Sequence, residues 1–510
     1  MNEVLRQLPP LIASHLLLAA AAMVLALAIA LPLALAAARR PTLARVTLGF
    51  AGITQTIPGL ALLALFYPLL LGLSALVGGG IPALGFLPAL LALTLYALLP
   101  ILRTAIAGLR GIDPAVMQAA DAIGMTPRQR LRLVEAPLAA PVAMAGIRTA
   151  AVWTIGTATL ATTVGYPTLG NPIFAGLQIE RWDLVLGGCV AAALLALAAE
   201  GALGLIERGM VRRDHRRIAA GLGLIVAGLL LALAPLARAP ARSVTIGAKN
   251  FSEQYILARL IGLRLEQAGY QVRYREGLGS TVAFQALGRG DIDVYVDYAG
   301  TLWTGVMHRQ DTAPRDVMLA GIEAWMAQRP KTALIGPLGF QNAYALAMRG
   351  GGGGVATIDA LAARAGALTL GADLEFLDRP EWRALQRRYG LSFRAGRAYS
   401  PTFMYRALAS GQVDVISAFS SDGRIAADRL TVLADTRGAI PRYDAILLVS
   451  PGHARDERMT RALRPLVNAI PVEAMRRANL MVDRDTNKAT PEAAARWLDR
   501  AIRSRTARPS

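Results

Sequence analysis

The sequence predicts two regions of different fold: an all-α polytopic membrane region, followed by an α/β region of two lobes. The chain has 510 residues, of which 54% are apolar, and this length predicts at least two domains. Asp, Glu, Lys and Arg are absent from Val46 to Leu102, a run far longer than a buried core helix needs, since one bilayer crossing takes about 20 apolar residues. After Arg242, charged residues return and short apolar segments alternate with helical patterns.

Hydropathy indicates about six membrane spans in the first region. They run approximately over residues 11–38, 46–77, 84–108, 139–163, 184–206 and 218–237. Pro58, Pro68 and three glycines at 78–80 interrupt the second span, which is therefore expected to hold a kinked or re-entrant helix. The basic clusters at 39–45, 103–132 and 208–217 fall on one side of the membrane, which the positive-inside rule makes the cytoplasm. The N-terminus and the region after residue 238 are then expected outside.

These patterns divide the chain into a membrane domain at 1–217, a membrane anchor and linker at 218–242, and an extracytoplasmic domain at 243–510. The anchor has a second interpretation. The basic run at 212–217, the apolar stretch and Ala237-Arg238-Ala239 resemble an internal signal sequence with a cleavage site. The apolar stretch is longer than the roughly 7–15 residues of a signal peptide, which favours an uncleaved anchor.

Composition argues against several function classes. The formal net charge is +19, but much of the basic excess flanks the apolar spans, so the membrane explains it without nucleic acid. The single cysteine, Cys189, allows no intrachain disulfide, and the four histidines are scattered, so no metal site is expected. No nucleophile–base pair or cofactor fingerprint is present, so the chain is not expected to be an enzyme, and no catalytic residue or cofactor is predicted.

A loop at 111–138 between the third and fourth spans reads as helix, turn, helix. Asp113 is a good N-cap with Pro114 at the first helical position. Gly124 suits the left-handed turn that ends a helix, and Thr126 caps a second helix that begins at Pro127. An amphipathic loop on the lipid headgroups would explain the basic residues of this loop equally well.

The same loop resembles the EAA loop of ABC importer permeases, in which a short helix docks into the ATPase subunit. The matching positions are Gln118, Ala119, Ala120, Gly124 and Pro137. Gln118 stands where the family usually has Glu, and Ala136 precedes Pro137 where Leu is common. Segments 54–63 and 144–150 are similar to permeases of quaternary-amine and osmoprotectant importers. The resemblance implies a type I ABC importer permease in the bacterial inner membrane, working as a homodimer. No Gly-x-x-x-x-Gly-Lys-[Ser/Thr] motif occurs, so a separate cytoplasmic subunit is expected to bind ATP.

The second region alternates strand and helix patterns. Strands are expected at 244–248, 271–275 and 291–296, with helices at 252–268, capped by Ser252, and 281–288. A second set of strands is expected at 344–348, 368–372, 414–418 and 446–449. This order predicts mostly parallel sheets in two α/β lobes, with the ligand at the carboxyl ends of the strands and crossings near residues 340 and 440.

Motifs in this region are similar to those of osmoprotectant-binding proteins. They lie at 247–254, 279–281, 291–295, 297–301, 371–376 and 419–425. The resemblance implies a type II periplasmic-binding-protein fold and a cage of aromatic rings around a quaternary ammonium group. Carried over by position, the ring residues are Tyr298, Tyr344, Phe419 and Tyr443, and the residues that hold a carboxylate are Lys249, Thr301 and Arg379. Phe419 stands where the family commonly has Tyr, and Arg379 could instead be a loop residue paired with Asp378.

The chemistry agrees with this resemblance, because a trimethylammonium group cannot donate a hydrogen bond and aromatic ring faces are its best partners. We therefore expect the permease and binding component of an ATP-driven importer for a trimethylammonium zwitterion such as glycine betaine. Ergothioneine, carnitine and choline remain alternative substrates. A ligand-gated transmembrane sensor is the alternative of another class, although a sensor needs only one or two spans.

Overall fold

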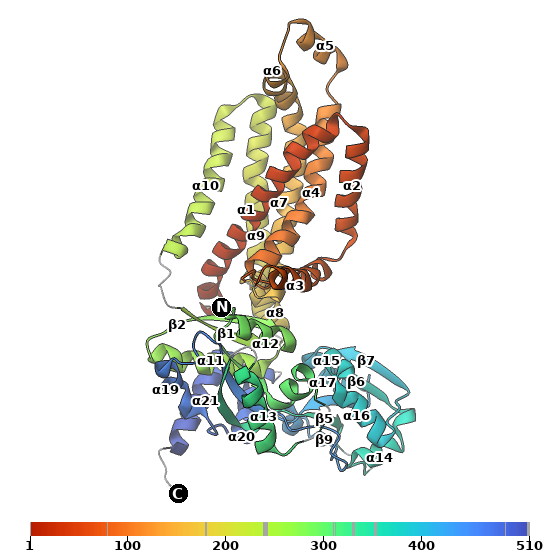
Figure 1. Ribbon diagram of the computed structural model, residues 1–510, viewed down its shortest axis with the longest axis vertical. Coiled ribbons are helices and arrows are strands. Elements are labelled where there is room, and N and C mark those ends of the chain that lie inside the picture. Colours follow the sequence, from red (N-terminus) through yellow and green to blue (C-terminus); the bar gives the residue numbers. More distant parts are fainter. Residues whose placement is uncertain are drawn as a thin grey trace. The chain divides into compact units, whose positions relative to one another are not determined.

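The computed structural model describes residues 2–78, 80–178, 181–237, 243–309, 311, 313–328, 332–350, 354–484 and 486–506. The chain forms two compact units (Figure 1). One contains residues 1–174 and 183–239, and the other contains residues 175–182 and 240–510. The expected linker at 238–242, together with most of the Ala237-Arg238-Ala239 segment, lies outside the described residues.

The first unit is entirely helical between its loops. Its helices are α1 (Asn2–Ala38), α2 (Pro41–Thr56), α3 (Gly59–Leu76), α4 (Phe86–Arg110), α5 (Pro114–Ala122), α6 (Pro127–Arg130), α7 (Ala136–Ala158), α9 (Trp182–Arg212) and α10 (His215–Ala237), together with the first half of α8 (Gly170–Gln178), whose second half is assigned to the other unit. Six helical segments in the described part of the chain are long and apolar enough to cross a membrane. The predicted number of spans is therefore confirmed by length and composition.

The expected span at 46–77 is two helices rather than one kinked helix. Helix α2 ends at Thr56, and Ile57 adopts an extended conformation, which a residue before proline favours. Helix α3 starts directly after Pro58, and Pro68 lies inside it. Only α3 of this pair meets the length needed for a span.

Helix α4 packs against both α1 and α7 in the centre of the first unit. The shared core is rich in small residues, among them Ala30, Ala97 and Ala105. An added Cβ at Gly146 of α7 would lie 1.9 Å from Thr104 Oγ1 of α4, so only glycine permits this close approach of the two helices. Helix α10, expected as a separate anchor, packs against α1.

The second unit contains ten strands and eleven α-helices in its described part. The strands are β1 (Ser243–Lys249), β2 (Gln271–Leu278), β3 (Val294–Tyr298), β4 (Ala333–Gln341), β5 (Tyr344–Met348), β6 (Thr369–Asp373), β7 (Ala395–Tyr399), β8 (Val415–Phe419), β9 (Thr431–Val432) and β10 (Asp444–Val449). The helices are α11 (Ser252–Gln267), α12 (Ser280–Arg289), α13 (Arg315–Gln328), α14 (Ile358–Ala362), α15 (Leu374–Asp378), α16 (Pro380–Tyr389), α17 (Pro401–Ala409), α18 (Arg424–Ala427), α19 (Glu457–Leu463), α20 (Val472–Asp483) and α21 (Pro491–Thr506).

The strands form two five-stranded sheets, which define two lobes. The first lobe has the order β2-β1-β3-β10-β4 and the second has β7-β6-β8-β5-β9. The chain passes between the lobes at Asn342–Ala343 and again before Asp444, and the Asn342 amide donates to the Tyr443 carbonyl at 2.9 Å. The two expected crossings therefore lie side by side.

Three expectations for this unit are wrong. The sheets are mixed rather than mostly parallel, because β10 runs antiparallel to β3 and β4, and β5 runs antiparallel to β8 and β9. Strand β10, grouped with the second set of strands, returns to the first sheet after the second crossing. Phe251 rather than Ser252 is the N-cap of α11, and its ring has no acceptor for a side-chain cap. The Ser252 hydroxyl donates to Asp483 instead.

Candidate ligand site and coupling loop

A cavity of about 360 Å³ lies between the two lobes of the second unit. Its lining comes from strand ends of both sheets and from the loops that follow them. The lining residues are Lys249, Asn250, Phe251, Gly279, Ser280, Tyr298, Thr301, Asn342, Tyr344, Asp373, Glu375, Asp378, Phe419 and Tyr443. The volume is at the lower end of the roughly 300–1,000 Å³ of small-molecule sites.

Five aromatic side chains of this lining form one cluster, which we call the cage: Phe251, Tyr298, Tyr344, Phe419 and Tyr443. The Tyr344 ring centroid lies 5.2 Å from that of Phe419 and 5.8 Å from that of Tyr443. Phe251 links the Tyr298 ring to this group, because its ring centroid lies 6.1 Å from that of Phe419 and 6.2 Å from that of Tyr298. All four ring residues predicted from the sequence therefore lie around one cavity, and Phe251 adds a fifth.

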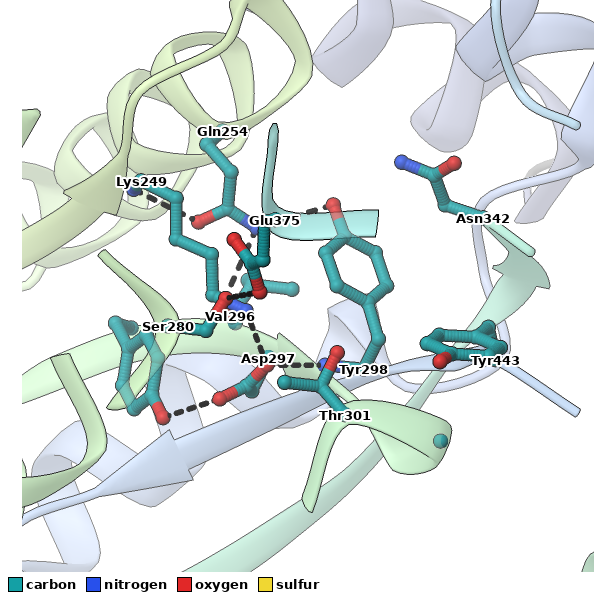
Figure 2. Close-up of polar contacts among 12 residues, drawn as sticks. Lys249, Gln254, Ser280, Val296, Asp297, Tyr298, Thr301, Asn342, Glu375 and Tyr443 are labelled. Atoms are coloured by element: carbon teal, nitrogen blue, oxygen red, sulfur yellow. Dashed lines mark hydrogen bonds and ion pairs between the residues drawn. The ribbon is translucent and has the colours of Figure 1, made fainter. Parts of the chain in front are cut away.

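Lys249 ends strand β1 and is almost fully buried. Its ammonium group lies 2.5 Å from Asp297 Oδ1 and 5.2 Å from the centroid of the Tyr298 ring. Figure 2 shows Lys249 and Asp297 on one side of Tyr298, with Tyr443 and Asn342 on the other. The charge of Lys249 is thus already balanced by a buried carboxylate of the neighbouring strand.

Arg379 does not line the cavity but lies directly behind it. Its guanidinium group donates to Thr301 Oγ1 and to the Tyr443 hydroxyl, each at 3.2 Å. Its ion pairs are with Glu375 at 2.8 Å and with Glu381 at 3.5 Å, so the pairing with Asp378 considered from the sequence is not the one observed. Burial opposes the charge of this guanidinium, but attraction from the Tyr443 and Tyr344 oxygens and from Glu381 and Glu375 outweighs it, so its pKa lies well above the usual value.

Acidic residues line the second lobe's side of the cavity. Asp373, Glu375 and Asp378 all belong to the lining. Burial raises the pKa of Asp373 to about 6, and the nearby carboxylate of Glu375 acts in the same direction. Because Lys249 is the only Lys or Arg among the lining residues, the cavity surface carries an excess of negative charge.

Hydrogen bonds join the two lobes beside the cavity. Ser280 of the first lobe donates to Glu375 of the second at 2.8 Å. Thr304, also of the first lobe, donates to Glu381 at 2.7 Å. With the Arg379 to Thr301 bond, these contacts join the start of α12 and the segment after β3 to helices α15 and α16.

The seven predicted ligand residues are thus brought together, six on the lining and Arg379 behind it. Sequence reasoning missed Phe251 and the three acidic residues. Phe251 lies within the motif at 247–254, and Asp373 and Glu375 lie within that at 371–376. The motifs carried the signal, but no sequence pattern says which of their side chains point into the cavity.

The loop at 111–138 has the helix–turn–helix form that the sequence predicts. The Asp113 side chain accepts from the Ala115 amide at 2.8 Å, and Gly124 has a φ of +75°. Thr126 and Gln129 form a capping box at the start of α6. Of the predicted coupling residues, Gln118, Ala119, Gly124 and Pro137 are exposed and Ala120 is buried. Three apolar side chains of the loop are exposed as well, Val116 by 40%, Ile123 by 73% and Leu133 by 65%.

Ion pairs connect this loop to the membrane helices. Arg130 binds Asp121 of α5 at 2.7 Å and Glu135 at 3.0 Å. Glu135 is buried and also binds Arg39, which follows α1, at 3.1 Å. The loop is therefore a defined structure tied to the segment that follows α1.

Fold and site together define a class: a polytopic membrane protein joined to a two-lobed domain with a cavity of small-molecule size between its lobes. Comparisons with known proteins agree with this class. Residues 242–500 match the family of the substrate binding domain of ABC-type glycine betaine transport systems. Residues 28–212 match the binding-protein-dependent transport system inner membrane component.

Individual proteins show the same likeness. The ergothioneine transport permease/ergothioneine binding protein of Helicobacter pylori is 29% identical over 413 residues, which cover 77% of this chain and 72% of the relative. The choline transport system permease protein of Bacillus subtilis is 41% identical over 175 residues, which cover 34% of this chain and 75% of the relative. A crystal structure of a glycine betaine/carnitine/choline ABC transporter covers 52% of this chain and 98% of its own, with 24% identity and a TM-score of 0.45.

The chain therefore belongs to the family of ABC importer components in which an inner-membrane permease is fused to a substrate-binding domain of the glycine betaine transport type. Members of this family are transport components rather than enzymes, and nothing in these matches supports the sensor alternative. Among the described residues, no group of three or more His, Cys, Asp or Glu is placed to hold a metal ion.

Proposed function

We propose that this chain captures a trimethylammonium zwitterion, with glycine betaine as the first candidate, and passes it through its own membrane domain. The observation that carries the proposal is the cage, because five rings around one cavity suit a cation that cannot donate a hydrogen bond. Each ring face contributes about 0.5–2 kcal/mol to such a cation when desolvated. Four or five rings therefore account for a large part of the roughly −8 kcal/mol of micromolar binding.

Lys249, Thr301 and Arg379 remain the candidates for holding the ligand's carboxylate. Thr301 and Lys249 line the cavity, and Arg379 donates to Thr301. Because Lys249 and Arg379 are already paired with carboxylates, a ligand carboxylate has to share their charge. The Arg379 Nε atom is buried and lies 3.5 Å from Glu381 without a hydrogen bond to a described residue, so we expect Arg379 to act on a ligand carboxylate through Thr301.

The acidic lining supports a second set of substrates. Asp373, Glu375 and Asp378 lie on the cavity and could accept hydrogen bonds, which glycine betaine does not donate. Choline and carnitine carry a hydroxyl, and ergothioneine carries a ring N–H. A ligand that combines the trimethylammonium group with such a donor would use both parts of the lining.

Membership in the family implies a cytoplasmic ATP-binding partner. The loop at 111–138 is the surface that we propose for its docking, since Ile123 and Leu133 are exposed apolar side chains there. We further propose that residues 1–217 form the permease as a homodimer, that 218–242 anchor the next domain, and that residues 243–510 lie on the outer face. The basic clusters at 39–45, 103–132 and 208–217 support this orientation.

The test is calorimetric titration of the full chain in lipid nanodiscs with glycine betaine, carnitine, choline and ergothioneine. Binding of glycine betaine with choline much weaker would support the carboxylate-holding role of Lys249 and Arg379. A preference for the ligands with donor groups would assign that role to the acidic lining. Failure of every trimethylammonium compound to bind would show the proposal to be wrong.

A further inference from the structure

Two tyrosines of the cage donate their phenolic protons to buried carboxylates outside the cavity. The Tyr298 hydroxyl donates to Glu253 at 2.6 Å, and the Tyr443 hydroxyl donates to Glu381. Glu253 is 3% exposed and Glu381 is 1% exposed. Neither is among the residues that line the cavity, so neither carboxylate faces the cavity directly.

The hydrogen bonds around Glu253 suit a carboxylate, because each of its oxygens accepts from a side-chain donor. Asn342 donates to one carboxylate oxygen at 3.0 Å, and Asn479 donates to the other at 2.9 Å. The Tyr298 oxygen already accepts from Gln254 at 3.0 Å, so its own proton points to Glu253. A separation of 2.6 Å lies within the roughly 2.5–2.7 Å of O–H···O⁻ bonds.

The same contacts fix which partner holds the proton. Burial raises the pKa of Glu253 above its usual value, and the hydrogen bonds from Tyr298, Asn342 and Asn479 offset only part of this rise. Burial also raises the pKa of Tyr298 well above its usual value, so the phenol remains the donor. Glu381 has a comparable set of partners, because it accepts from Thr304 at 2.7 Å and lies 3.5 Å from Arg379.

A phenol that donates to a carboxylate becomes richer in electrons. The attraction between a ring and a cation is electrostatic and depends on the negative charge of the ring face. In a buried site the field of the carboxylate itself is also weakly screened, because the surroundings have a low dielectric constant. Both effects make the faces of Tyr298 and Tyr443 better partners for a cation than ordinary tyrosine rings.

We propose that Glu253 and Glu381 are positioning residues that supply negative charge to a quaternary ammonium group through the rings of Tyr298 and Tyr443, without touching the ligand. The proposal rests on the proposed function, since it requires a cationic head group inside the cage. It also gives a basis for selectivity: a primary ammonium gains most from direct carboxylate contacts, which these buried groups do not offer. A trimethylammonium group cannot donate a hydrogen bond, so it loses nothing when these two carboxylates lie out of its reach.

The test compares a cationic ligand with its carbon analogue in the full chain in nanodiscs. Glycine betaine, choline and ergothioneine are titrated, and 3,3-dimethylbutanoate, in which carbon replaces the nitrogen of glycine betaine, is the uncharged-head probe. We expect Glu253→Gln to weaken binding of the cations about fivefold and to change that of the analogue by less than twofold. Tyr298→Phe keeps the ring and removes the bond to Glu253, so the double variant should bind no more weakly than the weaker single variant.

Glu473→Gln is the matched control, because Glu473 is an exposed carboxylate on α20 and should leave all affinities unchanged. Thermal unfolding checks that the variants fold, and Glu381→Gln with Tyr443→Phe provides a second pair should Glu253→Gln fail to do so. Additive effects of Glu253→Gln and Tyr298→Phe on affinity would overturn the proposal, and so would equal losses of affinity for the cations and the analogue. Where the analogue binds too weakly to measure, the double-variant comparison alone decides. A wild-type chain that binds none of the cations defeats the proposed function as well, whereas variants that bind like the wild type defeat only this inference.

Discussion

Replacing Tyr344 with leucine isolates what an aromatic face contributes to the site. The Tyr344 ring lies near the rings of Phe419, Tyr443 and Phe376, at centroid distances of 5.2, 5.8 and 4.9 Å. Leucine fills most of the same space with apolar atoms but has no ring face. The Tyr344 hydroxyl makes no hydrogen bond to another described residue, so Tyr344→Phe is a control that keeps the face and loses little else.

The size of the effect follows from the cost of one ring. A desolvated cation–π contact contributes about 0.5–2 kcal/mol, and each 1.4 kcal/mol is about tenfold in affinity. Tyr344→Leu should therefore weaken binding of a trimethylammonium ligand roughly 2- to 30-fold, and Tyr344→Phe should change it by less than about twofold. Because Tyr344 is 8% exposed, repacking in the leucine variant should also cost on the order of 1–3 kcal/mol of folding free energy.

Isothermal titration of the full chain measures the affinities, and thermal unfolding without ligand measures the stability separately. The leucine variant must be folded at the titration temperature for the comparison to hold. Wild-type affinity in the leucine variant would refute the reasoning, because the ring would then lie outside the ligand's surroundings. An equal loss in the phenylalanine variant would show that the hydroxyl, not the ring face, matters.

Three further predictions concern other parts of the chain. Tyr443→Phe removes the hydrogen bonds to Glu381 and Arg379. Because hydrogen bonds to charged groups contribute about 1.5–3 kcal/mol, we expect the ligand to bind roughly tenfold more weakly. We also expect faster hydrogen exchange at the lobe interface. Asp373 has a pKa raised to about 6, so it is ionised at pH 7 and largely protonated at pH 5, and affinity for a cation should fall about threefold over that interval. Ile123→Asp, on the exposed loop of the first unit, should leave ligand binding unchanged and abolish ligand-stimulated ATP hydrolysis by the complex with the ATP-binding subunit.

Each of these has a control and a contrary outcome. Tyr344→Phe serves as the control for Tyr443→Phe, and unchanged exchange rates at 301–304 would contradict a role at the lobe interface. Asp373→Asn should bind equally well at both pH values, and a persistent pH dependence in that variant would assign it to another group, such as Glu375. Ile123→Leu should retain coupling, and full ATP hydrolysis in the Ile123→Asp complex would remove this side chain from the docking surface.

Local signals in the sequence were sufficient for most elements of the fold. Asp113, Gly124 and Thr126 act through their own backbone neighbours, so the form of the loop at 111–138 could be read from residue types alone. The long apolar runs likewise gave the number of spans. The segment at Ile57 and Pro58 is the exception, because the expected kinked helix is two helices. Proline disfavours the helical conformation of the residue before it, and the chain breaks at Ile57.

Features that depend on long-range pairing were beyond the sequence patterns. Strand β10 is apolar from Ala445 to Val449, as a buried strand is in either sheet, and nothing local shows that it runs antiparallel between β3 and β4. The same holds for charge. Lys249 reads as a free cation in the sequence, but its partner Asp297 lies 48 positions along the chain, and only the pairing of β1 with β3 brings them together.

Rings from both lobes meet around one cavity, and this division has a kinetic consequence. Phe251 and Tyr298 belong to the first lobe, Tyr344 and Phe419 to the second, so a complete enclosure exists only while the lobes are together. We therefore expect a captured molecule to leave when the domain opens at Asn342 and Tyr443, not by passing individual rings. The residence time of each substrate should accordingly depend on how long it keeps the two lobes in contact. A weakly bound substrate should be found mainly with the domain open.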